Sequence, residues 1–128
     1  MYFETHAHFD DERYSEDREQ VIEEARRTGV DIIVNCGSTI RTSRASVDLA
    51  AKHDFVYASV GVHPHDAKSL NPENLLILKK LAKSPKVVAI GEIGLDFFYD
   101  HSERHTQKLW FEKQLEFAID IDLPVIHS

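Results

Sequence analysis

Cysteine is nearly absent from this chain, in which Cys36 is the only one. A disulfide bond within the chain is therefore excluded, and a reducing cytoplasm is the simplest expected location. Long apolar runs are also missing, so we expect no membrane partner. The first residues, Met1–Glu4, lack the basic and apolar regions of a secretory signal, and we expect none.

An excess of positive charge is missing as well, because 15 basic residues stand against 22 acidic ones and the net charge is −7. A broad basic surface for duplex nucleic acid is therefore excluded, and any phosphate contact must be local. Divalent cations would reverse the field inside an acidic site. Otherwise the composition, 42% hydrophobic and 29% charged, is that of a globular protein, and the length suits a single domain over residues 1–128.

Short apolar segments alternate with helical patterns along the chain. The predicted strands are residues 2–5, 31–35, 55–60, 87–90 and 123–126. The predicted helices are one capped by Ser15 and ended by Gly29, one over residues 42–52, one with Asn71 as cap and Pro72 at its first position, and one over residues 105–120. Strands joined through helices form a parallel sheet, which predicts the α/β class. The carboxyl ends of such strands carry the functional loops.

Two histidines one residue apart, His6 and His8, follow the start of the first predicted strand. Side chains at positions i and i+2 of a strand point to the same face, so both imidazoles are aimed at one point. Imidazole is a common ligand of divalent transition metals, and the pair predicts half of a coordination shell. The alternative is two surface histidines in a polar turn.

Glu92 is predicted at the carboxyl end of a strand that is otherwise apolar or glycine. An isolated buried carboxylate is costly, so a metal, another cation or a basic side chain must lie against it. Gly91 and Gly94 flank the acid and allow close approach of the backbone, which favours a ligand site. A structural salt bridge is the alternative.

His127 ends the last predicted strand. By itself it is typical of a packed or capping histidine. Because His6, His8 and Glu92 are predicted at the same edge of one parallel sheet, the four residues together predict a metal centre.

His63 and His65 follow the third predicted strand and share one direction on either side of Pro64. They are predicted either to face the substrate and donate to a phosphate or another oxyanion, or to make hydrogen bonds within their loop. Cys36 is interpreted as a small buried residue rather than a nucleophile. Asp10 and Asp96 are expected to orient histidines or to cap turns. The remaining histidines are expected to be solvated: His53, His101 and His105.

Five motifs occur in the order Thr5–Asp10, Gly61–His65, Gly91–Asp96, Gln114-Leu115 and Leu123–His127. Together they resemble those of the TatD family of metal-dependent hydrolases, in the amidohydrolase superfamily. The resemblance implies a TIM-type (β/α) barrel that binds two divalent cations and hydrolyses DNA phosphodiester bonds, often from a strand end. It also implies that His6 and His8 bind one metal, that Glu92 bridges both as the catalytic residue, and that His127 binds the second.

The chain departs from this family in length. A closed eight-stranded barrel takes about 250 residues, so this sequence accounts for about the first five strands and four helices. A histidine from the sixth strand and an aspartate from the eighth, which the resemblance implies, have no counterpart. An unclosed barrel would expose apolar sheet edges at its first and fifth strands. We expect self-association or a missing C-terminal half to cover them.

The function that we expect is hydrolysis of DNA, at ends or in single strands, by water activated between two divalent cations. The sequence does not distinguish Mg, Mn and Zn. Phe97, Phe98 and Tyr99 either offer a surface on which a terminal base stacks or pack against the fourth helix. One alternative function is hydrolysis of a non-nucleic-acid ester, amide or lactone on the same metal site. The other is an inactive half-barrel that acts as an interaction module.

Overall fold

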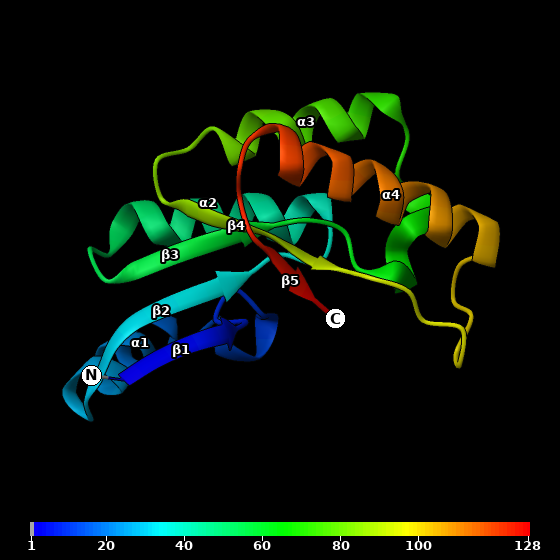
Figure 1. Ribbon diagram of the computed structural model, residues 1–128. Helices are drawn as coiled ribbons and strands as arrows, with labels where there is room; N and C mark the ends of the chain where they lie inside the picture. Colours follow the sequence, from blue (N-terminus) through cyan, green and yellow to red (C-terminus); the bar gives the residue numbers. More distant parts are fainter. Residues whose placement is uncertain (1) are drawn as a thin grey trace.

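A five-stranded parallel sheet forms the frame of the protein, with the strands in the order β1-β2-β3-β4-β5 (Figure 1). The structure is a computed structural model that describes residues 2–128. The strands are β1 (Tyr2–Ala7), β2 (Val30–Cys36), β3 (Val56–Val60), β4 (Val87–Ile93) and β5 (Val125–His127). Every neighbouring pair is parallel, which confirms the predicted α/β class and the parallel sheet.

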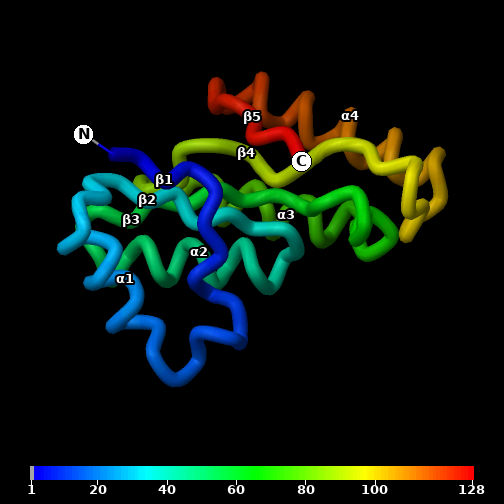
Figure 2. The backbone as a smooth tube through the Cα atoms, turned by 90° about the horizontal axis from the view of Figure 1, so that it is seen from below, coloured from blue at the N-terminus to red at the C-terminus, as the bar shows by residue number. Residues whose placement is uncertain are grey.

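Helices connect successive strands, as the alternating pattern predicts. They are α1 (Arg18–Arg27), α2 (Ile40–Lys52), α3 (Pro72–Ala82) and α4 (Arg104–Asp120), together with the short 3-10 helices η1 (Glu12–Tyr14) and η2 (Pro64–Ser69). Figure 1 shows α2, α3 and α4 along one side of the curved sheet and α1 beside β1 and β2, and Figure 2 shows the curvature from below. The described chain thus forms an open succession of βα units. None of its helices has the length and apolar character needed to cross a membrane.

The start of α3 is as predicted, and that of α2 lies two residues earlier than predicted. Asn71 caps α3 by accepting the backbone N–H of Asn74 at 2.8 Å. At α2, the Thr39 hydroxyl accepts the N–H of Thr42, and the Thr42 hydroxyl accepts the N–H of Thr39. This reciprocal capping box fixes Ile40 as the first residue of the helix.

The predicted start of the first helix is wrong, because Ser15 does not cap it. The chain forms η1 there, and α1 begins at Arg18. The Arg18 guanidinium donates to the carbonyl oxygens of Phe9 and Asp10 at 2.7 and 3.1 Å. These contacts fold the loop after β1 back onto the start of α1, so a long-range interaction overrides the local capping preference of serine.

The core lies between the helices and the central strands. Its most buried aliphatic side chains are Ile22, Ile33, Val56, Val60, Leu78, Ile90 and Ile93. The edge strands differ, because Tyr2 and Phe3 of β1 and Val125 of β5 are exposed. The predicted exposure of apolar groups at the first and fifth strands is therefore confirmed.

Candidate metal centre

The carboxyl ends of β1 and β4 bring His6, His8 and Glu92 together. The Nε2 atom of His6 lies 2.7 Å from Oε1 of Glu92, and Nε2 of His8 lies 3.3 Å from Oε2. One potential ligand atom from each residue lies within 4.8 Å of the others. The spacing of one residue between the histidines thus directs both imidazoles to a single carboxylate, as strand geometry requires.

Glu92 is only 7% exposed, yet its pKa lies below the ordinary value of 4.5. Burial alone would raise its pKa, but the hydrogen bond with His8 and the positive potential of His6 and His8 bring the pKa below its usual value. The same hydrogen bond raises the pKa of His8 against the opposing effect of burial. In the absence of a metal, protonated imidazole therefore compensates the buried carboxylate.

The second ring nitrogen of His8 faces the backbone, with Nδ1 3.1 Å from the carbonyl oxygen of Cys36. When Nδ1 carries the proton, it donates to this carbonyl, and the lone pair of Nε2 faces Glu92. Metal-binding histidines are oriented by such an outer hydrogen bond. Two imidazole nitrogens and one buried carboxylate therefore fit a divalent cation, which would take the place of the compensating protons.

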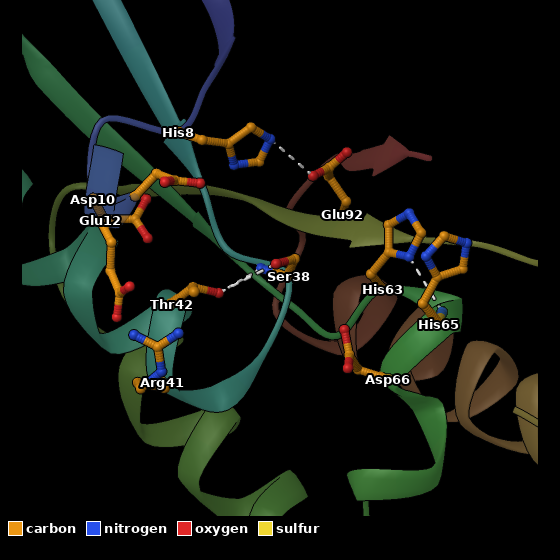
Figure 3. Close-up of a pocket in the computed structure, with 11 residues that line it drawn as sticks. His8, Asp10, Glu12, Ser38, Arg41, Thr42, His63, His65, Asp66 and Glu92 are labelled. Carbon is orange, nitrogen blue, oxygen red and sulfur yellow. Dashed lines mark hydrogen bonds and ion pairs between the residues drawn. The ribbon is translucent and has the colours of Figure 1, made fainter. Parts of the chain in front are cut away.

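A cavity of about 590 Å³ opens beside these donors (Figure 3). His8 and Glu92 face each other at its edge, and His63 and His65 form the neighbouring wall. The far side carries acidic groups and one cation: Asp10, Asp11, Glu12 and Arg41. The cavity therefore has an acidic wall and a histidine wall, which Asp66 also lines, and the hydrogen-bond donors for an anionic ligand lie on the histidine side.

His63 presents a neutral hydrogen-bond donor to this cavity. Its Nδ1 accepts the backbone N–H of His65 at 3.2 Å, so a neutral ring carries its proton on Nε2. Burial, and then the neighbouring His65, lower the pKa of His63. His65 is bound through Nε2 to the carboxylate of Asp96. The predicted hydrogen bond within the loop is therefore present at His63, and both histidines also line the cavity, while their contact with a substrate stays a prediction.

His127 lies outside the cluster formed by His6, His8 and Glu92. A methyl group added at Gly94 would lie 3.4 Å from Cε1 of His127, and the ring meets Phe111 of α4 edge-on at 6.0 Å. Of the four predicted donors, the structure thus brings three together. The fourth, at the end of β5, packs against Gly94 two residues after Glu92.

Asn35 is a buried polar residue that sequence reasoning did not place in the site. Its Oδ1 accepts the backbone N–H of Phe9 at 2.6 Å, and its Nδ2 donates to Asp10 and to Ser46, both at 2.8 Å. Asn35 thereby fixes the segment that follows His8. The sequence contained one indication of this role. Asn35 is an amide side chain at the end of an apolar strand, and a buried amide requires hydrogen-bond partners.

Two buried glutamines of α4 fix the other loops of the site. Gln114 accepts the N–H of Val62 at 2.8 Å and donates to its carbonyl oxygen at 3.2 Å, directly before His63. Gln107 makes the same pair of bonds with the backbone of Asp96 at 2.7 and 2.9 Å. Helix α4 therefore holds both the β3 and the β4 loop. In the sequence, Gln114 stood out only as part of a motif, and Gln107 had no signal of this role.

The weaker candidates have mixed outcomes. Cys36 is buried as predicted, and burial raises its pKa to about 11, which suppresses thiolate formation. Asp96 does orient a histidine, His65, whereas Asp10 accepts from Asn35 instead. His101 and His105 are exposed as predicted.

The prediction that His53 is solvated is wrong. Its side chain is 9% exposed, and its Nε2 lies 2.8 Å from the carboxylate of Glu19. The ring also packs edge-on against Phe55 at 5.9 Å. Packing of α1 beside the end of α2 covers a histidine that local sequence leaves in a loop.

The fold and the site together define a class: a segment of an α/β barrel with a histidine and carboxylate centre at the carboxyl ends of its strands. The sequence matches the family described as TatD related DNase over residues 3–128. The chain belongs to this family, as the motif resemblance indicated. The half-barrel matches that fold, with five of its parallel strands present.

Individual relatives support the same assignment. The chain is 41% identical over 126 residues to a Bacillus subtilis protein named "Uncharacterized metal-dependent hydrolase YabD", covering 98% of this chain and 49% of that one. It is 39% identical over 114 residues to a "3'-5' ssDNA/RNA exonuclease TatD" of Erwinia tasmaniensis, covering 88% and 44%. The crystal structure of YJJV, a TatD homologue from Escherichia coli, superposes with a TM-score of 0.89 at 33% identity, covering 98% and 49%. The chain thus spans about half the length of these relatives.

Proposed function

We propose that residues 1–128 are the N-terminal part, within a single domain, of a metal-dependent hydrolase that cleaves phosphodiester bonds in single-stranded nucleic acid, with DNA as the principal substrate. The observation that carries this proposal is the convergence of His6, His8 and Glu92 beside a cavity with a histidine wall. Membership of the TatD family supports the reaction class, and the relative named as a single-strand exonuclease supports the substrate class.

In this proposal His6, His8 and Glu92 would hold divalent cations, and His127 would contribute a further donor to a second one. Magnesium, manganese and zinc all accept such donors. When bound, divalent cations supply Lewis acidity toward phosphoryl oxygens and make water nucleophilic near neutral pH. A divalent cation requires a negatively charged ligand, and Glu92 suits this role because its pKa is lowered although the side chain is buried.

The histidine wall positions the phosphate in this proposal. His63, neutral and protonated on Nε2, donates a hydrogen bond to a non-bridging oxygen. His65 lines the same wall and is held by Asp96, so its ring does not have to be ordered when substrate binds. The acidic residues opposite repel the phosphate and thereby restrict it to the histidine side.

The test measures metal binding and hydrolysis separately. Calorimetry with Mg²⁺, Mn²⁺ and Zn²⁺ gives the stoichiometry, and end-labelled single-stranded DNA and small esters give the activity. Glu92→Gln should abolish tight binding and hydrolysis while the circular dichroism spectrum is retained, whereas Glu73→Gln, an exposed site on α3, should behave like the wild type. Retained hydrolysis by Glu92→Gln at full metal occupancy would refute the proposal, and cleavage of small esters but not DNA would refute the substrate class.

A second proposal concerns the exposed edges of β1 and β5, which carry Tyr2, Phe3 and Val125. Unpaired strand edges with apolar side chains favour association with other strands. We propose that these edges are covered by further strands of a longer chain or by a second copy. Sedimentation velocity distinguishes the two, because a second copy predicts a concentration-dependent dimer of this chain. A monomer with tightly bound metal and no hydrolysis would indicate that completion by further strands is required for activity.

A further inference from the structure

Two aromatic side chains are strongly exposed in the loop between β4 and α4. Phe98 is 87% and Tyr99 is 64% exposed. Phe97, in contrast, is half-buried against α4, with the guanidinium of Arg104 4.9 Å and the ammonium of Lys108 5.6 Å from its ring centroid. Of the two interpretations of these aromatic residues, packing against the fourth helix therefore applies to Phe97. Within residues 2–128, Phe98 and Tyr99 remain exposed.

The two exposed rings continue a row that begins inside the cavity. The row, here called the aromatic strip, consists of His63, His65, His101, Tyr99 and Phe98. Successive ring centroids are separated by 4.3, 4.5, 5.7 and 4.8 Å. Tyr99 and His101 are stacked with an interplanar angle of 14°. Because His63 and His65 line the proposed active-site cavity, the strip connects that cavity with the exposed loop.

Polar side chains hold the loops of the strip in place: Asp96, which is partly exposed, and the buried Ser102 and Gln107. The Oδ1 atom of Asp96 accepts the backbone N–H groups of Phe98 and Tyr99 at 3.0 and 3.2 Å, and the other oxygen binds His65. Ser102 donates to the carbonyl oxygen of His65 at 3.1 Å, and Gln107 donates to that of Ser102 at 2.9 Å. The backbone that carries the exposed rings is therefore held before any ligand arrives, which lowers the entropic cost of binding.

We propose that the aromatic strip is a stacking subsite for the bases of a single-stranded nucleic acid whose phosphodiester lies in the cavity. This inference rests on the proposed function and names the residues that bind the substrate beside the reacting bond. Aromatic rings stack on any base face, so they bind single strands without a broad basic surface. That matches a chain with a net charge of −7. Unstacked bases are available in single strands and are hidden inside a duplex.

The location of the strip favours this ligand over a strand that completes the sheet. Figure 1 shows the β4–α4 loop projecting beyond the carboxyl ends of the strands, away from β1. The strip therefore lies beside the cavity, in the loops after β3 and β4, rather than in the edge strands β1 and β5. Two cations lie close to it, since Lys68 donates to the carbonyl oxygen of His101 at 3.1 Å and Arg104 to Asp100 at 3.1 Å. Lys68 supplies local positive charge for a sugar-phosphate backbone, whereas the charge of Arg104 is paired with Asp100.

Binding is measured in EDTA, where the wild type cannot depend on a metal, by fluorescence anisotropy with a labelled oligodeoxyadenylate. Phe98→Ala and Tyr99→Ala should each weaken binding about fivefold or more. Tyr99→Phe, which keeps the ring, and Leu76→Ala, an exposed site on α3, should bind like the wild type. An oligonucleotide with abasic sites should bind the wild type weakly and should be insensitive to Phe98→Ala. RNA of the same sequence shows whether the subsite distinguishes the two sugars.

Several results would overturn the stacking subsite: no base-dependent binding by the wild type, unchanged affinity of both alanine variants, or an equal loss for intact and abasic strands. The Glu92→Gln variant separates this inference from the proposed function, because it should keep base-dependent binding and lose hydrolysis. Base-dependent binding by a protein that hydrolyses no nucleic acid with any metal, even once the open edges of β1 and β5 are covered, would refute the proposed function and leave the subsite standing. In an active wild type, Phe98→Ala should raise KM and leave kcat nearly unchanged.

Discussion

Asn35 is the buried side chain that ties the segment after His8 to β2 and α2, and Asn35→Ala tests how the metal centre is held. The substitution removes the acceptor of the Phe9 N–H and the donor to Asp10 and Ser46. Asn35 is fully buried, so the lost partners are not simply replaced by bulk water. We therefore expect both the stability and the metal affinity to fall.

The magnitude follows from the groups left without partners. The Phe9 N–H loses its acceptor, which costs about 1–3 kcal/mol for a buried donor. The Ser46 hydroxyl keeps its bond to the Thr42 carbonyl oxygen at 2.8 Å, so its loss is limited to about 1 kcal/mol. We expect the free energy of unfolding to fall by about 2–4 kcal/mol. Asn35 acts on His8 only through the neighbouring Phe9, so we expect the metal affinity to fall about 10-fold, the lower end of the effect of losing a direct outer hydrogen-bond partner.

Urea unfolding of the metal-free protein measures the first effect, and calorimetric titration with Zn²⁺ or Mn²⁺ under folding conditions measures the second. Ser46→Ala is the matched control, because it breaks the contact between Asn35 and α2 and leaves the Phe9 bond intact. It should cost about 1 kcal/mol and leave the metal affinity unchanged. The reasoning would be refuted if Asn35→Ala were no less stable than Ser46→Ala, or if it bound metal as tightly as the wild type.

Three further predictions concern the metal centre and β5. A metal at 100 times its Kd should stabilise the wild type by about 2.7 kcal/mol, and Glu92→Gln should abolish this stabilisation. Thermal unfolding with metal and with EDTA measures the effect. A metal-induced rise in Tm of the variant equal to that of the wild type would contradict the prediction. Without metal, the raised pKa of His8 stabilises the fold below the ordinary value of 6.5, and this contribution is lost as the pH rises through the raised pKa. The lowered pKa of Glu92 stabilises it above the ordinary value of 4.5, and this is lost as the pH falls through the lowered pKa. The stability difference between wild type and Glu92→Gln should therefore be largest between these two values and should shrink at lower and at higher pH. A difference in urea midpoints that stays the same from well below pH 4.5 to well above pH 6.5 would count against the pairing. Gly91→Ala should lower the free energy of unfolding in urea by about 1–3 kcal/mol, because the new methyl group would lie 2.6 Å from the Cβ atom of Ile126 and 2.7 Å from its carbonyl oxygen. An unchanged urea midpoint would show that β5 does not pack against Gly91.

Features that depend on neighbours in sequence were predictable. Asn71 and Pro72 specify the start of α3, because a cap and a preset φ angle act within one helical turn. The shared direction of His6 and His8 follows from the two-residue period of a strand.

Features that depend on contacts between distant segments were not predictable. Ser15 satisfies the local rule for a helix cap, but the contact of Arg18 with the Phe9 carbonyl oxygen decides where α1 begins. His53 is covered by α1. The roles of Asn35 and Gln114 could not be assigned, because their partners are backbone groups of other elements.

The sequence by itself determined the alternation of strands and helices, the family, and the kinds of donor at the strand ends, because periodicity and residue chemistry are local properties. Only the tertiary structure decided which donors meet. The pairing of β1 with β2 and the curvature of the sheet bring His6 and His8 of one strand end to Glu92 of another. The register shift between β4 and β5 accompanies the placement of His127 against Gly94, apart from that cluster. The distance between strand ends depends on register and curvature, which are set by packing across the whole sheet.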